Sequence, residues 1–104
     1  PILFELINHK KLLVAMFPKS EIDTIIFSAI KEIIKDNKSV NKETIFIGAD
    51  SNIDSVDIVQ IISYVEDQLE DKGYEGYDLF EKTFEQELLT FDDFSDLIDN
   101  YLNC

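Results

Sequence analysis

The sequence predicts an all-α fold: a small bundle of four helices, preceded by an extra helical segment at the N-terminus. Two observations predict it. Apolar residues recur at three- and four-residue spacing in successive segments, and polar helix-capping residues precede those segments. The chain has 104 residues and 45% hydrophobic content, which suits one core and not two. We therefore expect an N-terminal extension over residues 1–17 and one domain over residues 18–104.

The N-terminal extension carries leucines at spacings that one helical face allows, and Pro18 would stop such a helix. Met16 is the only methionine of the chain. The segment is therefore either partly upstream of a natural start at Met16 or a linker from a larger protein, and the sequence leaves both open.

The first helix of the domain is expected from Ser20 to Asn37. Ser20 and Asp23 form a variant of the capping box, which supplies acceptors for the free amides of a first helical turn. The apolar stripe that follows consists of Ile22, Ile26, Ile30 and Ile33, with Ile25 and Ala29 beside it.

A long polar loop, residues 37–53, follows this helix and contains the apolar triplet Ile-Phe-Ile at residues 45–47. We expect the triplet to anchor the loop to the core rather than to form a strand, because no second strand-like run is available to pair with it.

The next helix is expected to begin at Asp54 or Ser55 and to end near Asp71, because Gly73 suits the left-handed residue that closes a helix. Its buried side is predicted to hold Ile58, Ile62, Val65 and Leu69, flanked by Val59 and Ile61. Its exposed side is predicted to hold Asp57, Gln60, Tyr64, Asp67 and Asp71.

Two further helices are expected. Asp78 can cap a short or irregular helix whose apolar residues are Leu79, Phe80, Phe84 and Leu88. Thr90 and Asp93 repeat the capping-box pattern and predict the start of a last helix. The apolar face of that helix comprises Phe91, Phe94, Leu97, Ile98, Tyr101 and Leu102.

The formal net charge of −13 is unevenly spread. Residues 1–42 hold seven lysines and five acids, whereas residues 43–104 hold two lysines and seventeen acids. Such a field repels nucleic-acid phosphates and anionic lipids and favours basic protein surfaces. We expect a monomer with basic protein partners, no nucleic acid and no membrane. A single cysteine, Cys104, and a single histidine, His9, form no disulfide or metal site, which suits a reducing cytoplasm.

Ser55 lies where the polar loop becomes an amphipathic helix, between the carboxylates of Asp54 and Asp57. No histidine or lysine near it in the sequence can activate it as a catalytic nucleophile, so we do not expect an enzyme. A helix N-terminus does favour an attached phosphate, through its free amides and its dipole. If a separate transferase activates the Ser55 hydroxyl, it can attack a phosphate and become a phosphodiester anchor.

The run from Asn52 to Asp57, Asn-Ile-Asp-Ser-Val-Asp, resembles the prosthetic-group site of acyl carrier proteins, whose pattern is Gly-Leu-Asp-Ser-Leu-Asp before an amphipathic helix. The likeness extends over roughly Ile22 to Leu102, in the order helix, long loop, serine-bearing helix, short segment and last helix. Asn52 replaces the usual glycine, and Gln60 stands where an acid is common.

The resemblance implies a bundle of acyl-carrier type with 4'-phosphopantetheine on Ser55, attached by a phosphopantetheinyl transferase. The carrier would hold acyl groups as thioesters and deliver them to enzymes of fatty-acid, polyketide or related pathways. Recognition of these partners is implied for Asp54, Asp57, Gln60, Glu66 and Asp67. Candidates to line an acyl-chain cavity are Val59, Ile62 and Val65, each of which also suits an ordinary core position.

Two other functions stay open: an aminoacyl or peptidyl carrier, and an acidic helical adaptor that binds proteins without modification. Ser51 mimics the motif but needs a one-residue insertion to align the helix. A calcium loop that starts at Asp50 fails, because its sixth position is Ser55 rather than glycine and its twelfth is Ile61 rather than glutamate.

Overall fold

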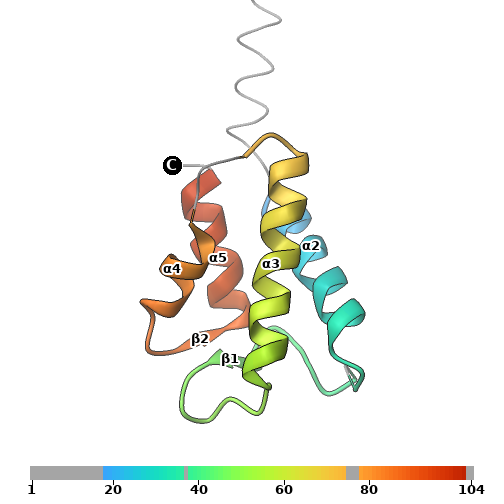
Figure 1. Ribbon diagram of the computed structural model, residues 1–104, viewed down its shortest axis with the longest axis vertical. Coiled ribbons are helices and arrows are strands. Elements are labelled where there is room, and N and C mark those ends of the chain that lie inside the picture. The colour runs from blue at the N-terminus through green and yellow to red at the C-terminus, as the bar shows by residue number, and fades with distance from the viewer. Residues whose placement is uncertain (1–17, 37, 75–77, 103–104) are drawn as a thin grey trace, which may run out of the picture.

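The computed structural model describes residues 18–36, 38–74 and 78–102 (Figure 1). These residues form four helices and one two-stranded sheet, which confirms the prediction of a mainly helical domain. The helix expected within residues 1–17 lies outside the described residues.

Three long helices form the body of the domain: α2 (Lys19–Ile33), α3 (Ser55–Asp71) and α5 (Phe91–Leu102). α2 packs against both α3 and α5, and the shorter α4 (Leu79–Phe84) packs against α3. The strands β1 (Ile45–Ile47) and β2 (Leu89–Thr90) lie at the end of the bundle where α3 and α5 begin (Figure 1). The start of α3 thus lies at the same end of the bundle as the sheet (Figure 1).

One hydrophobic core fills the space between these elements. The predicted buried sides of α2 and α3 are buried, apart from the half-buried Ile33 and from Val59. Val59 is 43% exposed, so its predicted place on the buried side of α3 is wrong. The core is closed at the sheet end by Phe46, whose ring centroid lies 4.8 Å from that of Phe91 and 4.9 Å from that of Phe94. Aromatic rings at these separations attract one another beyond the effect of burial alone. The triplet at residues 45–47 therefore anchors the loop, as expected.

The prediction that this triplet forms no strand is wrong. Ile45–Ile47 pairs antiparallel with Leu89–Thr90, with an irregularity in the register between Ile45 and Ile47. The partner strand has only two residues, and it lies between α4 and α5 along the chain. A strand of this length shows no alternation of apolar and polar residues, so its pattern was not visible in the sequence.

The predicted cap of the first helix is also wrong. α2 begins at Lys19, one residue after Pro18, and Ser20 lies inside the helix. The Pro18 carbonyl accepts the backbone N–H of Ile22 at 3.3 Å, so the proline itself provides the first helical acceptor. The helix ends at Ile33 rather than at Asn37.

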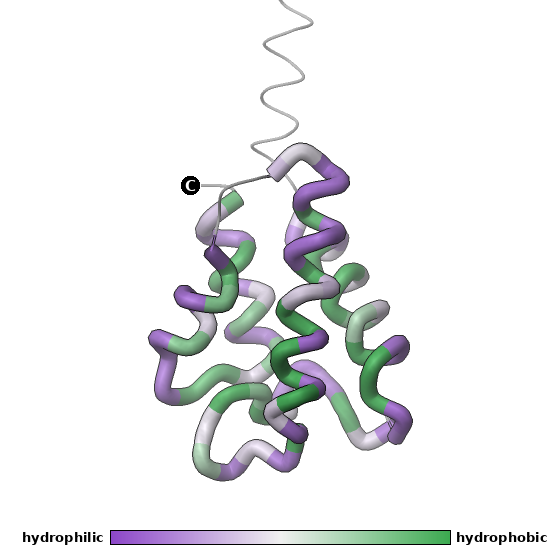
Figure 2. Tube along the Cα trace, viewed as in Figure 1, coloured by the Kyte–Doolittle hydropathy of each residue, from purple (hydrophilic) through white to green (hydrophobic). Residues whose placement is uncertain are grey.

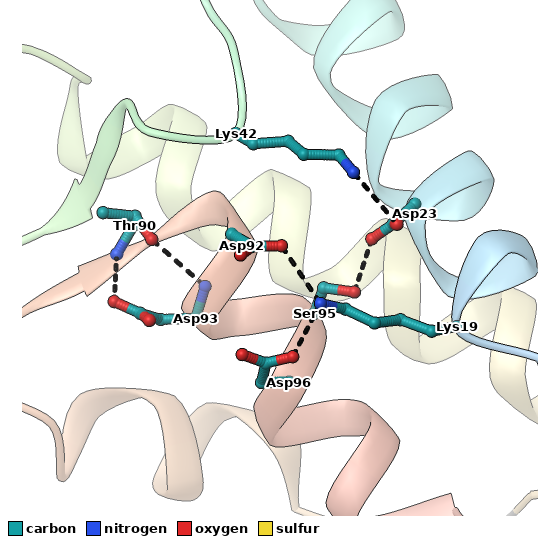
Figure 3. Close-up of polar contacts among 8 residues, drawn as sticks. All are labelled: Lys19, Asp23, Lys42, Thr90, Asp92, Asp93, Ser95 and Asp96. Carbon is teal, nitrogen blue, oxygen red and sulfur yellow. Dashed lines mark hydrogen bonds and ion pairs between the residues drawn. The ribbon is translucent and has the colours of Figure 1, made fainter.

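Asp23, the other half of that expected capping box, binds across the domain instead. Its carboxylate accepts a hydrogen bond from the Ser95 hydroxyl of α5 at 2.5 Å and lies 3.6 Å from Lys42 Nζ (Figure 3). Lys19 Nζ lies 3.1 Å from Asp92 and 2.7 Å from Asp96. These polar contacts join α2 to α5 along one side of the bundle.

The hydrogen bonds to Asp96 and Asp92 hold the pKa of Lys19 above its ordinary value.

The predicted ends of α3 are confirmed. The Asp54 carboxylate accepts the backbone N–H of Val56 at 3.0 Å, which caps the helix. At the other end Gly73 has φ +95°, its N–H binds the Glu70 carbonyl, and the N–H of Tyr74 binds the Leu69 carbonyl. This is the Schellman arrangement, which satisfies two of the last carbonyls of the helix.

The caps of the last two helices are confirmed as well. The Asp78 carboxylate accepts the N–H of Glu81 at the start of α4. Thr90 and Asp93 each accept the other's backbone N–H with a side-chain oxygen, both at 3.1 Å (Figure 3). The apolar run of the third helix, however, ends early. Phe84 is the last residue of α4 and is 52% exposed, and Leu88 beyond it is 59% exposed.

Candidate functional site

Ser55 is the first residue of α3 and is exposed to solvent. Asp54 occupies the capping position: its side chain binds the Val56 N–H, and its carbonyl accepts the Ile58 N–H at 3.0 Å. The serine hydroxyl is therefore not needed to cap the helix. It has no hydrogen-bond partner among the described residues. An external reagent can reach this oxygen without breaking a contact within the described fold.

The hydroxyl of Ser51, the other serine of the motif region, is hydrogen-bonded within the fold, unlike that of Ser55. Its hydroxyl donates to the Phe46 carbonyl at 3.0 Å and accepts the N–H of Ile53 at 3.3 Å. The residue is half-buried, and the two bonds fix the turn that leads from β1 to α3. Modification of Ser51 would break this turn, whereas modification of Ser55 would not.

The first turns of α3 carry an exposed apolar surface beside the serine. Val56 is 60% exposed and Val59 is 43% exposed. Figure 2 shows the contrast along the helix: its first half is mostly hydrophobic and its second half mostly hydrophilic. Of the three residues expected to line an acyl cavity, Ile62 and Val65 are fully buried at 0% exposure, but Val59 lies at the surface.

An acidic cleft of about 690 Å³ adjoins the start of α3, between the end of α2 and the loops on either side of β1. Its carboxylates are those of Asp36, Glu43, Asp50, Asp54 and Asp57. The other residues of its wall are either apolar or polar without charge: Ile34, Val40, Ile45 and Ile53, and Ser39, Thr44 and Asn52. The cleft concentrates negative potential next to the serine, which speeds the approach of a basic protein surface.

Four of the five residues expected to recognise partners lie at the start of α3 or along it, with Asp67 near its other end. Asp54, Gln60 and Asp67 are exposed, and Asp57 is half-buried in the wall of the cleft. No three metal-ligating side chains gather into a metal site within the ranges that the structure describes.

Glu66, the fifth, has a role inside the fold that the sequence did not indicate. Its carboxylate accepts the backbone N–H of Leu79 at 3.3 Å, which holds the start of α4 against α3. Burial raises the pKa of Glu66, and the neighbouring carboxylates of Asp78, Glu70 and Asp67 raise it further, against the opposing effect of the Leu79 hydrogen bond. The two residues are thirteen positions apart, and no local sequence pattern connects them.

Glu66→Gln is expected to stabilise the domain at neutral pH. Because the pKa of Glu66 is raised in the folded state, its contribution to stability is greatest below the ordinary value of 4.5 and falls as the pH rises through the folded-state pKa. Glutamine keeps an acceptor for the Leu79 N–H and removes the charge. We expect a gain of up to about 1 kcal/mol at neutral pH and none at about pH 3, measured by urea unfolding at both pH values.

Glu32→Gln provides the control, because it removes one negative charge from an exposed position on α2. A gain as large for Glu32→Gln as for Glu66→Gln would mean that only the net charge matters. A loss of stability in Glu66→Gln at both pH values would contradict the burial of a charge at this site.

No helix in the described part of the chain combines the length and apolar character needed to cross a bilayer. No protein-family model, no curated protein and no solved structure matches the chain.

Proposed function

We propose that the domain is an acyl carrier, which holds acyl groups as thioesters on a 4'-phosphopantetheine group attached to Ser55. The observation that carries the proposal is the state of the Ser55 hydroxyl. It is exposed at the first residue of a capped helix, and no described residue binds it. Since Asp54 caps the helix, a modified Ser55 leaves α3 intact.

The order of elements also supports the proposal. A helix, a long loop, the serine-bearing helix α3, the short helix α4 and the last helix α5 follow one another as in the acyl-carrier type of bundle. The small sheet formed by β1 and β2 is an addition to that scheme. It joins the loop before Ser55 to the residues that precede α5.

The residues around Ser55 fit the group that we propose for it. The phosphodiester would be attached at the N-terminus of α3, where the helix dipole favours negative charge. Asp54 and Asp57 oppose that phosphate, at a cost that water and salt reduce because Asp54 is exposed. The attached group supplies a terminal thiol that forms thioesters with acyl groups.

Attachment requires a separate transferase, with coenzyme A and magnesium. The Ser55 oxygen forms a bond to the phosphorus that carries the pantetheine, and the phosphoanhydride bond of coenzyme A breaks. Adenosine 3',5'-bisphosphate leaves, and the serine proton passes to a base of the transferase. The chain itself then acts as a carrier rather than as an enzyme, in a reducing compartment such as the cytoplasm.

Partner enzymes would dock on the exposed start of α3. Val56 and Val59 offer apolar contact there, and the acidic cleft supplies complementarity to a basic surface. Asp54 and Gln60 are exposed there, and Asp67 is exposed nearer the other end of the helix. Glu66 is less available to a partner, because its carboxylate binds the start of α4.

Mass spectrometry tests the proposal. The purified chain is incubated with coenzyme A, magnesium and a broad-specificity phosphopantetheinyl transferase. We expect the mass of one phosphopantetheine group to be added to the wild type and to Ser51→Ala, and none to Ser55→Ala. Circular dichroism of both variants shows whether each is folded.

Labelling that disappears in Ser51→Ala and persists in Ser55→Ala would refute the assignment of the serine. If the folded wild type gains no mass, the carrier proposal fails and an unmodified adaptor replaces it. The thioester on protein purified from its own cell distinguishes an acyl carrier from an aminoacyl or peptidyl carrier.

A further inference from the structure

The outer surface of α2 carries an exposed aromatic ring between two hollows. Phe27 is 55% exposed, although the core lies on the other side of its helix. A cavity of about 250 Å³ lies on one side of it, between α2, residues 40–42 and the start of α5. A second hollow of about 330 Å³ lies on its other side. Phe27 and Asp23 line both hollows, so the ring forms the ridge between them.

The first of these hollows is apolar at its base. Ile26, Ile30 and Phe91 line it and are 4%, 6% and 3% exposed. Half-buried Val40 completes the wall. Apolar surface that is hollowed and rimmed by polar groups marks a binding site more often than does a scattered exposed side chain. The size of this hollow suits one large aliphatic or aromatic side chain. The second hollow is more polar, because Phe27 is the only apolar residue that lines it, beside Asp23, Thr24, Ser28 and Lys31.

The charges around Phe27 indicate which kind of partner can bind. Lys31 Nζ lies 5.0 Å from the centre of the Phe27 ring, and Lys42 lines the rim of the first hollow with 66% of its side chain exposed. The one acid in the lining, Asp23, is already bound by Ser95 and Lys42 (Figure 3). The rim therefore presents positive charge that the fold does not fully neutralise.

This rim stands apart from the rest of the domain in its charge. Five of the seven lysines in the described residues lie between residues 19 and 42, whereas sixteen of the twenty described acids follow residue 42. An acidic segment is repelled by the surfaces of α3, α4 and α5 and is least repelled here. A basic segment would bind those other surfaces instead.

We propose that the Phe27 surface, made of Phe27, Lys31, Lys42 and the two hollows, docks an acidic segment of a partner protein. The segment places one large apolar side chain in the first hollow, against the Phe27 ring, and carboxylates against Lys42 and against Lys31, which lines the second hollow. Anchoring by apolar side chains with flanking charges is a common mode of peptide recognition. Neither hollow is lined by Ser55, so this docking does not depend on its modification.

Selection of random peptides of about twelve residues on the immobilised full chain tests the proposal. The enriched peptides should carry an excess of aspartate and glutamate and at least one large apolar residue. Fluorescence polarisation of the labelled peptides then gives their Kd. We expect Phe27→Ala and Lys31→Glu each to weaken binding at least about tenfold, and added salt to weaken binding to the wild type.

Matched controls are available on α4. Phe84→Ala removes another exposed phenylalanine and Lys82→Glu reverses another exposed lysine, and both should change the Kd less than about twofold. Binding to Ser55→Ala should equal binding to the wild type. The proposal is overturned if no peptide is enriched, if the enriched peptides are basic, or if Phe27→Ala binds them as tightly as the wild type.

Discussion

Phe46→Ala is expected to lower the free energy of unfolding by about 3–5 kcal/mol. Phe46 is fully buried at 0% exposure, and its ring contacts those of Phe91 and Phe94. Its removal leaves a cavity between β1 and α5 and releases the loop that leads to Ser55. Domains of this size have only about 5–15 kcal/mol of stability, so the variant should be largely unfolded at moderate urea concentration.

Urea unfolding followed by circular dichroism measures this effect, with Phe84→Ala as the control. Phe84 is 52% exposed, so the same chemical change there should cost less than about 0.5 kcal/mol. An equal m-value for the wild type, Phe46→Ala and Phe84→Ala would show that all three unfold by the same reaction. If Phe46→Ala cost less than about 1 kcal/mol, the ring would not be the closing element of the core.

The loss at Phe46 should also affect modification of the serine. The Phe46 carbonyl accepts a hydrogen bond from the Ser51 hydroxyl, which in turn accepts the N–H of Ile53, the residue directly before the Asp54 cap of α3. The anchor, the turn and the serine are therefore one connected unit. This connection explains why an apolar triplet stands in an otherwise polar loop.

The parts of the fold that the sequence predicted depend on neighbouring residues. Asp54, Asp78 and the Thr90–Asp93 pair each cap a helix that starts within three residues of them, and Gly73 closes one. A local pattern is sufficient for such features, because donor and acceptor are fixed by the helix itself. The exposed position of Ser55 follows from the same local geometry.

Contacts between distant residues could not be predicted in this way. β1 finds its partner more than forty residues later, and Ser95 binds Asp23 from 72 positions away. Glu66 was expected to recognise partners, yet its carboxylate binds the start of α4. In each case the contact partner is determined by how the helices and strands pack together. No local pattern in the sequence indicates that packing.

Removal of two buried hydroxyls, one at a time, should change the stability of the domain in opposite directions. Ser95 is 1% exposed, and its hydroxyl donates to the Asp23 carboxylate. Thr83 is 0% exposed, and its hydroxyl has no partner among the described residues. Hydrogen bonds to charged groups contribute about 1.5–3 kcal/mol, whereas an unbonded buried hydroxyl costs about 1–3 kcal/mol. Ser95→Ala should therefore destabilise the domain, and Thr83→Val should stabilise it by about 1 kcal/mol.

Urea unfolding of both variants shows whether each substitution raises or lowers the free energy of unfolding. A double-mutant cycle with Asp23→Ala then identifies the cause of the effect of Ser95→Ala. Removing Ser95 should cost about 1 kcal/mol less once Asp23 is absent, since the partner of its hydroxyl is then gone. Equal costs with and without Asp23 would mean that Ser95→Ala acts only through the small cavity it leaves. A loss of stability in Thr83→Val would show that its hydroxyl has a partner after all, because valine keeps the shape of threonine and removes only the polar group.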